Sequence, residues 1–184
     1  MRLHPPHSPG PPWMAAGIWV EHCAGKRSTV TMDDNACVVD TNVLVYSTVS
    51  GNPWHQQARQ WLATLQGKGL DLCVTTQILR EYMVVLTRGT VFEKSFSIDQ
   101  VLAQIRALLP SLAVLDEPLA SADLLRTLVQ RYQICGKNIH DANIVAVMLA
   151  HEVRRLATYN QTDFQRFDEI ILETMIVEDS TGEA

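Results

Sequence analysis

The stretch "CVVDTNVLVY", residues 37–46, decides the fold class, because it places an ionisable side chain, Asp40, inside an apolar and β-branched run. Residues 37–39 predict a short buried strand that ends at Asp40. Thr41 and Asn42 follow, so Asp40 can also be a structural residue whose side chain caps the next helix. The stretch alone leaves both interpretations open: a helix cap, or a functional carboxylate at the end of a strand.

Strand-like and helix-like segments alternate along the rest of the chain. Further strands are predicted at residues 70–74, 111–115, 155–158 and 170–177. Helices are predicted at residues 54–67, 75–86, 97–110, 120–132 and 138–151. Their expected N-caps include Thr75 or Thr76, Ser97 in a capping box with Gln100, and Asn138 or His140. Strands separated by helices indicate an α/β fold with a mainly parallel sheet covered on both sides, and ligands of such sheets bind beyond the carboxyl ends of the strands.

The composition of the 184-residue chain limits its class. Hydrophobic residues make up 47% and charged residues 19%, which is typical of one globular domain, and we expect that domain at residues 35–178. The net charge of −5 argues against an architectural DNA binder, so any basic binding surface must be local. The longest apolar stretch, residues 144–150, is far shorter than the roughly 18 residues of a membrane span. Four cysteines without a CxxC pair indicate buried reduced thiols, and we expect a cytoplasmic protein without membrane contact.

The two ends of the chain differ in pattern from this domain. Residues 1–34 are rich in proline and glycine and lack helical or strand periodicity, which predicts a disordered leader. Met32 directly precedes the patterned region, so our hypothesis is that natural translation begins there. Residues 179–184 are expected to form a flexible tail.

Two further acids lie on apolar helix faces. Glu81 and Asp141 each have apolar residues three and four positions away, which directs both carboxylates toward the core or its rim. The apolar neighbours are Ile78, Val84 and Val85 for Glu81, and Ile144, Val145, Met148 and Leu149 for Asp141. Each acid also has a structural alternative. Glu81 can pair with Arg80 or Arg88 at the rim, and Asp141 can stabilise the first turn of its helix through the macrodipole.

Several inward carboxylates together require a compensating charge. Burying one unpaired carboxylate costs several kcal/mol, and burying several adds mutual repulsion. Because the apolar stripes carry no inward Lys or Arg, a bound Mg²⁺ or Mn²⁺ ion is the simplest solution for oxygen-only ligands. Asp163 is the expected fourth acid, with Asn160 as the competing candidate beside the fourth strand.

Four segments in this order resemble a known family: "VVDTNVLVY", "ILREYMVVLTR", "KNIHDANIVAVML" and "LATYNQTDF". They are similar to PIN-domain ribonucleases, in particular VapC-type toxins of bacterial toxin–antitoxin pairs, over about residues 37–177. The resemblance implies a three-layer α/β/α domain with an approximately five-stranded sheet. It assigns Asp40, Glu81 and Asp141 as an acidic triad. Asn42 matches a polar residue that orients the cluster, and Thr158 matches a recurring hydroxyl near it. Asn160 stands where many members carry Asp, which leaves the second metal site open.

From these residues we hypothesise metal-assisted hydrolysis of RNA phosphodiester bonds. Asp40, Glu81, Asp141 and Asp163 would hold one or two Mg²⁺ or Mn²⁺ ions, with Asn42, Thr158 and Asn160 supporting the site. The resemblance implies an antitoxin partner, and we also expect a homodimer. His140 is interpreted as a cap or surface residue, and the candidates for guiding RNA are Arg80, Arg88, Lys94, Lys137 and Arg154.

Two alternatives remain at this stage. One is a non-catalytic PIN-like module that binds RNA or protein. The open assignment of the fourth acidic position favours this alternative. The other is a phosphoryl-transfer or phosphatase domain with Asp40 as a covalent nucleophile. The second alternative usually needs another Asp two residues later, but position 42 is Asn.

Overall fold

The computed structural model of the protein describes residues 35–89 and 95–175, which belong to one unit of the chain, residues 32–184. The expected leader at residues 1–34 and the expected tail at residues 179–184 lie outside the described residues. So do Lys94 and the end of the last predicted strand, at residues 176–177.

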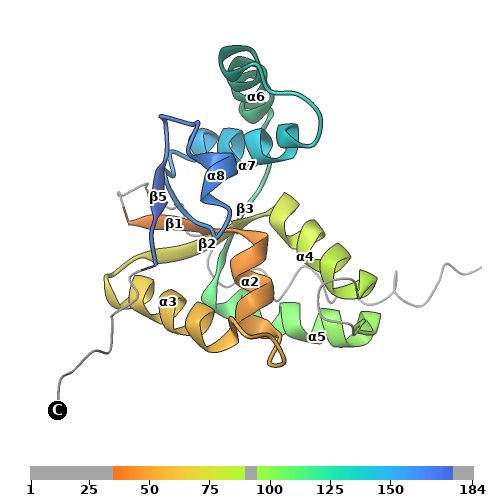
Figure 1. Cartoon of the computed structure of the whole chain (residues 1–184). Coiled ribbons are helices and arrows are strands. Elements are labelled where there is room, and N and C mark those ends of the chain that lie inside the picture. Colours follow the sequence, from red (N-terminus) through yellow and green to blue (C-terminus); the bar gives the residue numbers. More distant parts are fainter. Residues whose placement is uncertain (1–34, 90–94, 176–184) are drawn as a thin grey trace, which may run out of the picture. The chain divides into compact units, whose positions relative to one another are not determined.

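Five parallel strands form one sheet (Figure 1). Their order across the sheet is β3-β2-β1-β4-β5, and every neighbouring pair is parallel. The prediction of a mainly parallel sheet of about five strands is therefore confirmed. The strands are β1 (Ala36–Val39), β2 (Asp71–Thr75), β3 (Ala113–Leu115), β4 (Arg155–Ala157) and β5 (Ile171–Glu173).

Helices flank the sheet, as expected for an α/β fold. In Figure 1, α6 and α7 lie above the strands and α3 lies below them. The helices are α2 (Thr41–Thr48), α3 (His55–Gly67), α4 (Thr76–Arg88), α5 (Ile98–Leu108), α6 (Leu119–Tyr132), α7 (Asn138–Ala150) and α8 (Gln161–Phe164), with a short 3-10 helix, η2 (Leu109–Ser111). Among the described residues, none of these helices has the length and apolar content needed to cross a bilayer.

Two of the predicted helix starts are confirmed by hydrogen bonds. The Thr75 hydroxyl accepts from the Ile78 backbone N–H at 3.2 Å. Ser97 and Gln100 exchange the two bonds of a capping box. Both caps satisfy amide groups that the first turn of a helix leaves without an internal partner.

Helix α7 begins at Asn138 as predicted, but its predicted cap is wrong. Neither Asn138 nor His140 caps this helix; Lys137 is the N-cap residue and makes no side-chain cap bond. The reason is a backbone turn that replaces a side-chain cap. The Ile139 N–H donates to the Gly136 carbonyl at 3.3 Å, and the His140 N–H donates to the Lys137 carbonyl at 3.0 Å.

The core of the domain lies on both faces of the sheet. Cys37, Val38 and Val39 of β1 are completely buried, as is Leu156 of β4. Central strands of a parallel sheet that is covered on both faces are expected to be continuous apolar runs. The completely buried Met148 of α7 belongs to the same core cluster.

The cysteines agree only in part with the expectation of buried thiols. Cys37 and Cys73 are free and buried, and burial raises the pKa of Cys37 to about 12. Cys135 is free but exposed, so for this residue the expectation is wrong. Cys135 lies in the turn between α6 and α7, where no packed element covers it. Cys23 lies outside the described residues.

The strand order fixes where a ligand site can form. The chain runs from β1 outward to β2 and β3, and then returns to place β4 on the other side of β1. The carboxyl ends of β1 and β4 therefore flank the point where the strand order reverses, which is where ligands bind in open parallel sheets. Asp40 follows β1 directly, and its N–H donates to the Ala157 carbonyl of β4 at 3.0 Å.

Candidate active site

Asp40 is a helix cap, and it also lies at the carboxyl end of a strand, where its sequence allowed a functional carboxylate. It is the N-cap of α2, and its Oδ1 accepts from the Thr41 backbone N–H at 2.6 Å. Its Oδ2 accepts from the Thr158 hydroxyl at 2.6 Å and from Asn42 Nδ2 at 2.7 Å. The residue is only 6% exposed, and this burial, together with the charge of Glu81, raises the pKa of Asp40 despite the three hydrogen bonds. Asp40 is thus a firmly held, buried carboxyl group.

Asn42 and Thr158 join the ends of β1 and β4 around Asp40. Asn42 Nδ2 lies 3.2 Å from the Thr158 hydroxyl, and Asn42 Oδ1 accepts from the Tyr159 N–H at 3.1 Å. The same hydroxyl accepts from the Asn160 N–H at 2.9 Å. These contacts fix the orientation of the Asp40 carboxylate from two segments that lie more than 110 residues apart.

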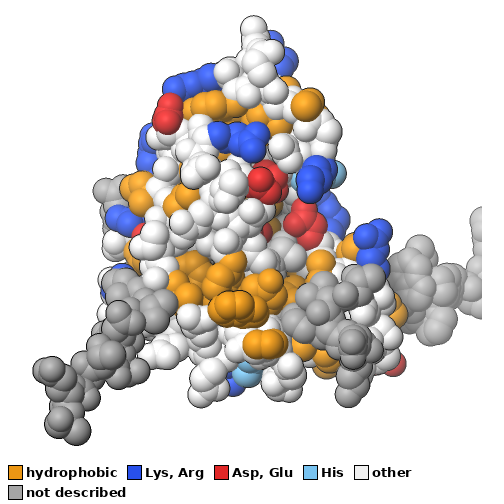
Figure 2. All heavy atoms as spheres, viewed as in Figure 1, with side chains coloured by type: hydrophobic (Ala, Val, Ile, Leu, Met, Phe, Trp, Pro, Cys, Tyr) orange, Lys and Arg blue, Asp and Glu red, His pale blue; other side chains and the backbone are white. Residues whose placement is uncertain are grey.

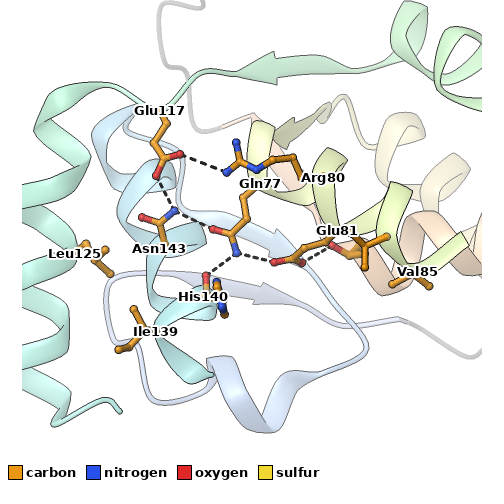
Figure 3. Close-up of a pocket in the computed structure, with 11 residues that line it drawn as sticks. Gln77, Arg80, Glu81, Val85, Glu117, Leu125, Ile139, His140 and Asn143 are labelled. Atoms are coloured by element: carbon orange, nitrogen blue, oxygen red, sulfur yellow. Dashed lines mark hydrogen bonds and ion pairs between the residues drawn. The ribbon is translucent and has the colours of Figure 1, made fainter. Parts of the chain in front are cut away.

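Glu81 is held by uncharged donors. Its Oε2 accepts from the Thr41 hydroxyl at 2.9 Å, and its Oε1 accepts from Gln77 Nε2 at 2.7 Å. Arg80 instead lies 3.7 Å from Glu117, and among the described residues no ion pair involves Glu81. The alternative in which Glu81 pairs with a neighbouring arginine is therefore wrong for Arg80, because that side chain turns toward Glu117 (Figure 3).

Asp141 lies in the first turn of α7, as its sequence position allowed. Burial, together with the negative charges of Asp163, Asp40 and Glu81, raises the pKa of Asp141 to about 6, although the charge of Arg166 acts in the opposite direction. No described residue donates a hydrogen bond to its carboxylate. The structure thus places the other three predicted acids within electrostatic reach of Asp141, whose carboxylate accepts no hydrogen bond from the described residues.

Asp163 and Asn160 occupy adjacent positions in this arrangement. Asp163 lies in the first turn of α8, and its Oδ2 accepts from Asn160 Nδ2 at 2.6 Å. After burial, Asp163 is the largest of the influences that raise the pKa of Asp141. Of the two candidates for a fourth acidic position, Asp163 therefore carries a charge that acts on Asp141, and Asn160 contacts Asp163.

The donor set of the site has the chemistry of a hard divalent cation site. The four acids offer only oxygen, which Mg²⁺ and Mn²⁺ prefer, and within the described part of the chain none of them has a Lys or Arg ion pair. As the described side chains lie, no three His, Cys, Asp or Glu groups are close enough together to hold one ion. Because Mg²⁺ usually binds through one or two carboxylates and keeps several waters, the donor set still fits this ion.

A pocket of about 610 Å³ adjoins Glu81 between α4, α6 and α7 (Figure 3). Its polar lining is continuous, because Gln77 points toward Glu81 and toward the His140 carbonyl, while Asn143 points toward Gln77 and Glu117. Its apolar lining residues are Val84, Val85, Leu125 and Ile139. Figure 2 shows acidic side chains grouped near the middle of one face, with basic side chains beside them.

The predicted basic residues differ in their relation to the acids. Arg154 precedes β4 and so lies at the amino end of the sheet, opposite to the acids. Arg80 lines the pocket, and Lys137 is exposed just before α7. Arg166, which the sequence did not single out, is the basic residue whose charge lowers the pKa of Asp141.

Thr41, Gln77 and Asn143 are the other residues that the sequence did not reveal. Gln77 stands four residues before Glu81, and this spacing of a glutamine and an acid on one helix is the signal that predicts their contact. Thr41 and Asn143 carry no comparable signal, because their contacts cross between elements that lie far apart in the sequence.

Comparisons with known proteins agree with the fold. A family model described as the PIN domain matches residues 37–170. VapBC2 from Rickettsia felis, solved with a DNA fragment from its promoter, matches with a TM-score of 0.54 and 21% identity, over 75% of this chain and 97% of that chain. VapC20 from Mycobacterium tuberculosis, a sarcin–ricin loop cleaving toxin, matches with a TM-score of 0.55 and 16% identity, over 73% and 98%. VapBC-1 from nontypeable Haemophilus influenzae gives a TM-score of 0.54 and 18% identity, over 75% and 96%. No curated protein matches the sequence.

Proposed function

This chain belongs to the PIN domain family, and on that premise we propose that it is a metal-dependent endoribonuclease and the toxin of a toxin–antitoxin pair. The observation that carries the proposal is the convergence of acids from four separate segments on Asp141: the charges of Asp163, Asp40 and Glu81 raise the pKa of Asp141, and the charge of Glu81 also raises the pKa of Asp40. Such a concentration of negative charge at the carboxyl end of a parallel sheet is costly for the fold and is expected where a cation binds.

The residues of the site have distinct tasks in this proposal. Asp40 is fixed by three hydrogen bonds and provides a carboxylate with one orientation. Glu81 is held by Thr41 and Gln77, which leave lone pairs free on both of its oxygens. Asp141 provides a carboxylate to which no residue of the described part of the chain donates, so it gains most from a cation.

Asp40, Glu81 and Asp141, with Asp163, would hold Mg²⁺ or Mn²⁺ in this proposal. When bound, such an ion neutralises the carboxylates, activates the attacking water and stabilises the charge that develops on the phosphoryl group. Asn42 and Thr158 keep Asp40 in place, and Asn160 keeps Asp163 in place.

RNA as the substrate and an antitoxin as the partner are supported by the structural relatives. The M. tuberculosis relative is described as cleaving the sarcin–ricin loop, and the R. felis relative is a VapBC toxin–antitoxin complex. By this analogy we expect an antitoxin partner and cleavage of RNA. A homodimer, a cytoplasmic location and residues 35–178 as the functional domain remain predictions from the sequence. Light scattering on the purified chain tests the homodimer.

The decisive experiment is RNA hydrolysis by matched acid-to-amide variants. A panel of single-stranded and structured RNAs, including a sarcin–ricin loop oligonucleotide, is incubated with Mg²⁺ or Mn²⁺. We expect Asp40→Asn and Asp141→Asn to lose at least about 100-fold in rate, because each removes charge from the reacting centre. Asp123→Asn is the matched control, since this exposed acid of α6 lies outside the site and pairs with Arg126. Equal cleavage by the parent and all three variants would remove the proposal.

The second candidate function is a PIN-like module that binds RNA or protein without cutting. The observation in its favour is that no three metal-binding side chains lie close together among the described residues. Calorimetric titration with Mn²⁺ separates the two functions. The nuclease requires Mn²⁺ binding that Asp40→Asn abolishes, and the binding module predicts no Mn²⁺ binding that depends on Asp40.

A further inference from the structure

Gln77 is a buried amide beside the acids that the reaction described above does not use. It lies in the first turn of α4, one helical turn before Glu81, and is only 6% exposed. A buried side-chain amide is costly unless its donors and acceptor are all satisfied. Each donor and acceptor of the Gln77 amide is therefore expected to have a hydrogen-bond partner.

Every bond of this amide leads to a residue of the acid site or its immediate neighbours (Figure 3). Gln77 Nε2 donates to Glu81 Oε1 at 2.7 Å and to the His140 carbonyl at 3.0 Å. Gln77 Oε1 accepts from Asn143 Nδ2 at 2.9 Å. Both donor hydrogens and the acceptor are engaged, a set that neither glutamate nor a hydroxyl side chain can reproduce.

The two partners on α7 flank Asp141. His140 precedes Asp141 by one residue and Asn143 follows it by two. One side chain of α4 thus joins the carboxylate of Glu81 to the helical turn that carries Asp141. The two carboxylates repel each other, and Gln77 is the side chain that ties Glu81 to α7, while the Thr41 hydroxyl ties Glu81 to α2.

We propose that Gln77 is a positioning residue, which holds Glu81 at a fixed separation from Asp141 so that both carboxylates act on the same divalent cation. This inference rests on the proposed function. Groups that orient metal ligands from outside the ligand set typically change metal affinity or activity 10–100-fold when they are removed. Gln77 is such a group for two acids at once, because it contacts Glu81 directly and the backbone beside Asp141.

Tyr82 of the same helix provides a matched control. Its side chain is completely buried, and its hydroxyl lies 2.9 Å from the Thr48 hydroxyl and 2.7 Å from Gln104 Oε1. These bonds join α4 to α2 and α5 and do not contact any of the acids. Tyr82→Phe therefore removes buried hydrogen bonds of α4 without touching the proposed metal site.

The test compares Mn²⁺ binding by isothermal titration calorimetry in the full chain. Gln77→Met, with Gln77→Leu as a second variant should the first not fold, is expected to weaken Mn²⁺ affinity by about 10–100-fold. Tyr82→Phe is expected to lower the melting temperature and to change the affinity by less than about twofold. In a Glu81→Gln background, Gln77→Met should add little further loss, because its effect acts through Glu81.

The possible results separate this inference from the proposed function. Parent-like Mn²⁺ affinity in a folded Gln77 variant, with binding abolished by Asp40→Asn, would overturn the role of Gln77 and leave the nuclease standing. Fully additive losses for Gln77→Met and Glu81→Gln would also overturn it. A parent protein that binds no Mn²⁺ would overturn both.

Discussion

Replacing Asp141 by asparagine is expected to stabilise the metal-free protein while impairing its function. In the folded protein the pKa of Asp141 rises from its ordinary value of 3.8 to about 6, because burial and three neighbouring acids disfavour the charged form. About two pKa units correspond to roughly 3 kcal/mol at 1.36 kcal/mol per unit. Water screens part of this interaction at a partly exposed side chain, so we expect Asp141→Asn to raise the free energy of unfolding by about 1–2 kcal/mol at pH 7.5.

The pH dependence of this gain has a defined sign. Between pH 3.8 and about 6, the folded protein keeps the Asp141 proton that the unfolded chain has lost. The folded state then binds more protons, so the free energy of unfolding falls as pH rises. The destabilisation by Asp141 is absent below pH 3.8 and complete above about pH 6. Urea unfolding in EDTA, followed by circular dichroism at pH 7.5 and at pH 4, measures the difference between variant and parent at both limits.

Two results would refute this reasoning. One is an Asp141→Asn variant that is no more stable than the parent in EDTA at pH 7.5; the other is a gain that stays the same at pH 4. Asp123→Asn, at an exposed site on α6, should remain within about 0.5 kcal/mol of the parent at both pH values. In excess Mn²⁺ the parent should become more stable than Asp141→Asn. A ligand at 100 times its Kd adds about 2.7 kcal/mol to the free energy of unfolding of the protein that binds it.

Three other substitutions test the packing around the site. Thr158→Val should lower the free energy of unfolding at pH 7.5 by about 1.5–3 kcal/mol, because the Asp40 carboxylate loses its 2.6 Å hydroxyl donor; an unchanged urea midpoint would contradict this. Leu156→Ala should cost about 2–5 kcal/mol in urea unfolding, since this side chain is completely buried in β4, and a loss below 1 kcal/mol would argue against that burial. Arg80→Gln should change the thermal midpoint very little, because its 3.7 Å ion pair with Glu117 is solvent-exposed; a shift equivalent to more than about 1 kcal/mol would show that the pair matters.

Much of the sheet was predictable because its strands are short apolar runs bounded by turn or helix signals. Residues 37–39 and 155–157 were both predicted to lie in strands, and their parallel pairing in the sheet confirms this. The order of the strands was not predictable, since the pairing of Val38 with Leu156 depends on packing between distant segments. Helix α2 was suggested only by its cap at Asp40. Its β-branched sequence favours a strand, and tertiary context overrides that preference.

The acids of the site were visible in the sequence because a charge on an apolar pattern is conspicuous. The spacing also placed Glu81 beside Ile78 and Val84, but only the first is buried and the second is 44% exposed, so this face of α4 is a rim. Uncharged partners such as Thr41 and Gln77 do not stand out against a helical pattern. Their hydrogen bonds follow from the three-dimensional approach of α2, α4 and α7.

The return of the chain to place β4 beside β1 has a consequence for synthesis on the ribosome. While residues 155–163 are still inside the ribosome, the nascent chain lacks the Thr158 hydroxyl that holds Asp40. It also lacks the Asp163 carboxylate. The earlier segments can collapse, but the group of four acids has no complete form until nearly the whole domain has emerged. If these acids form the proposed nuclease site, activity would arise only late in synthesis, and an antitoxin partner would have until then to bind.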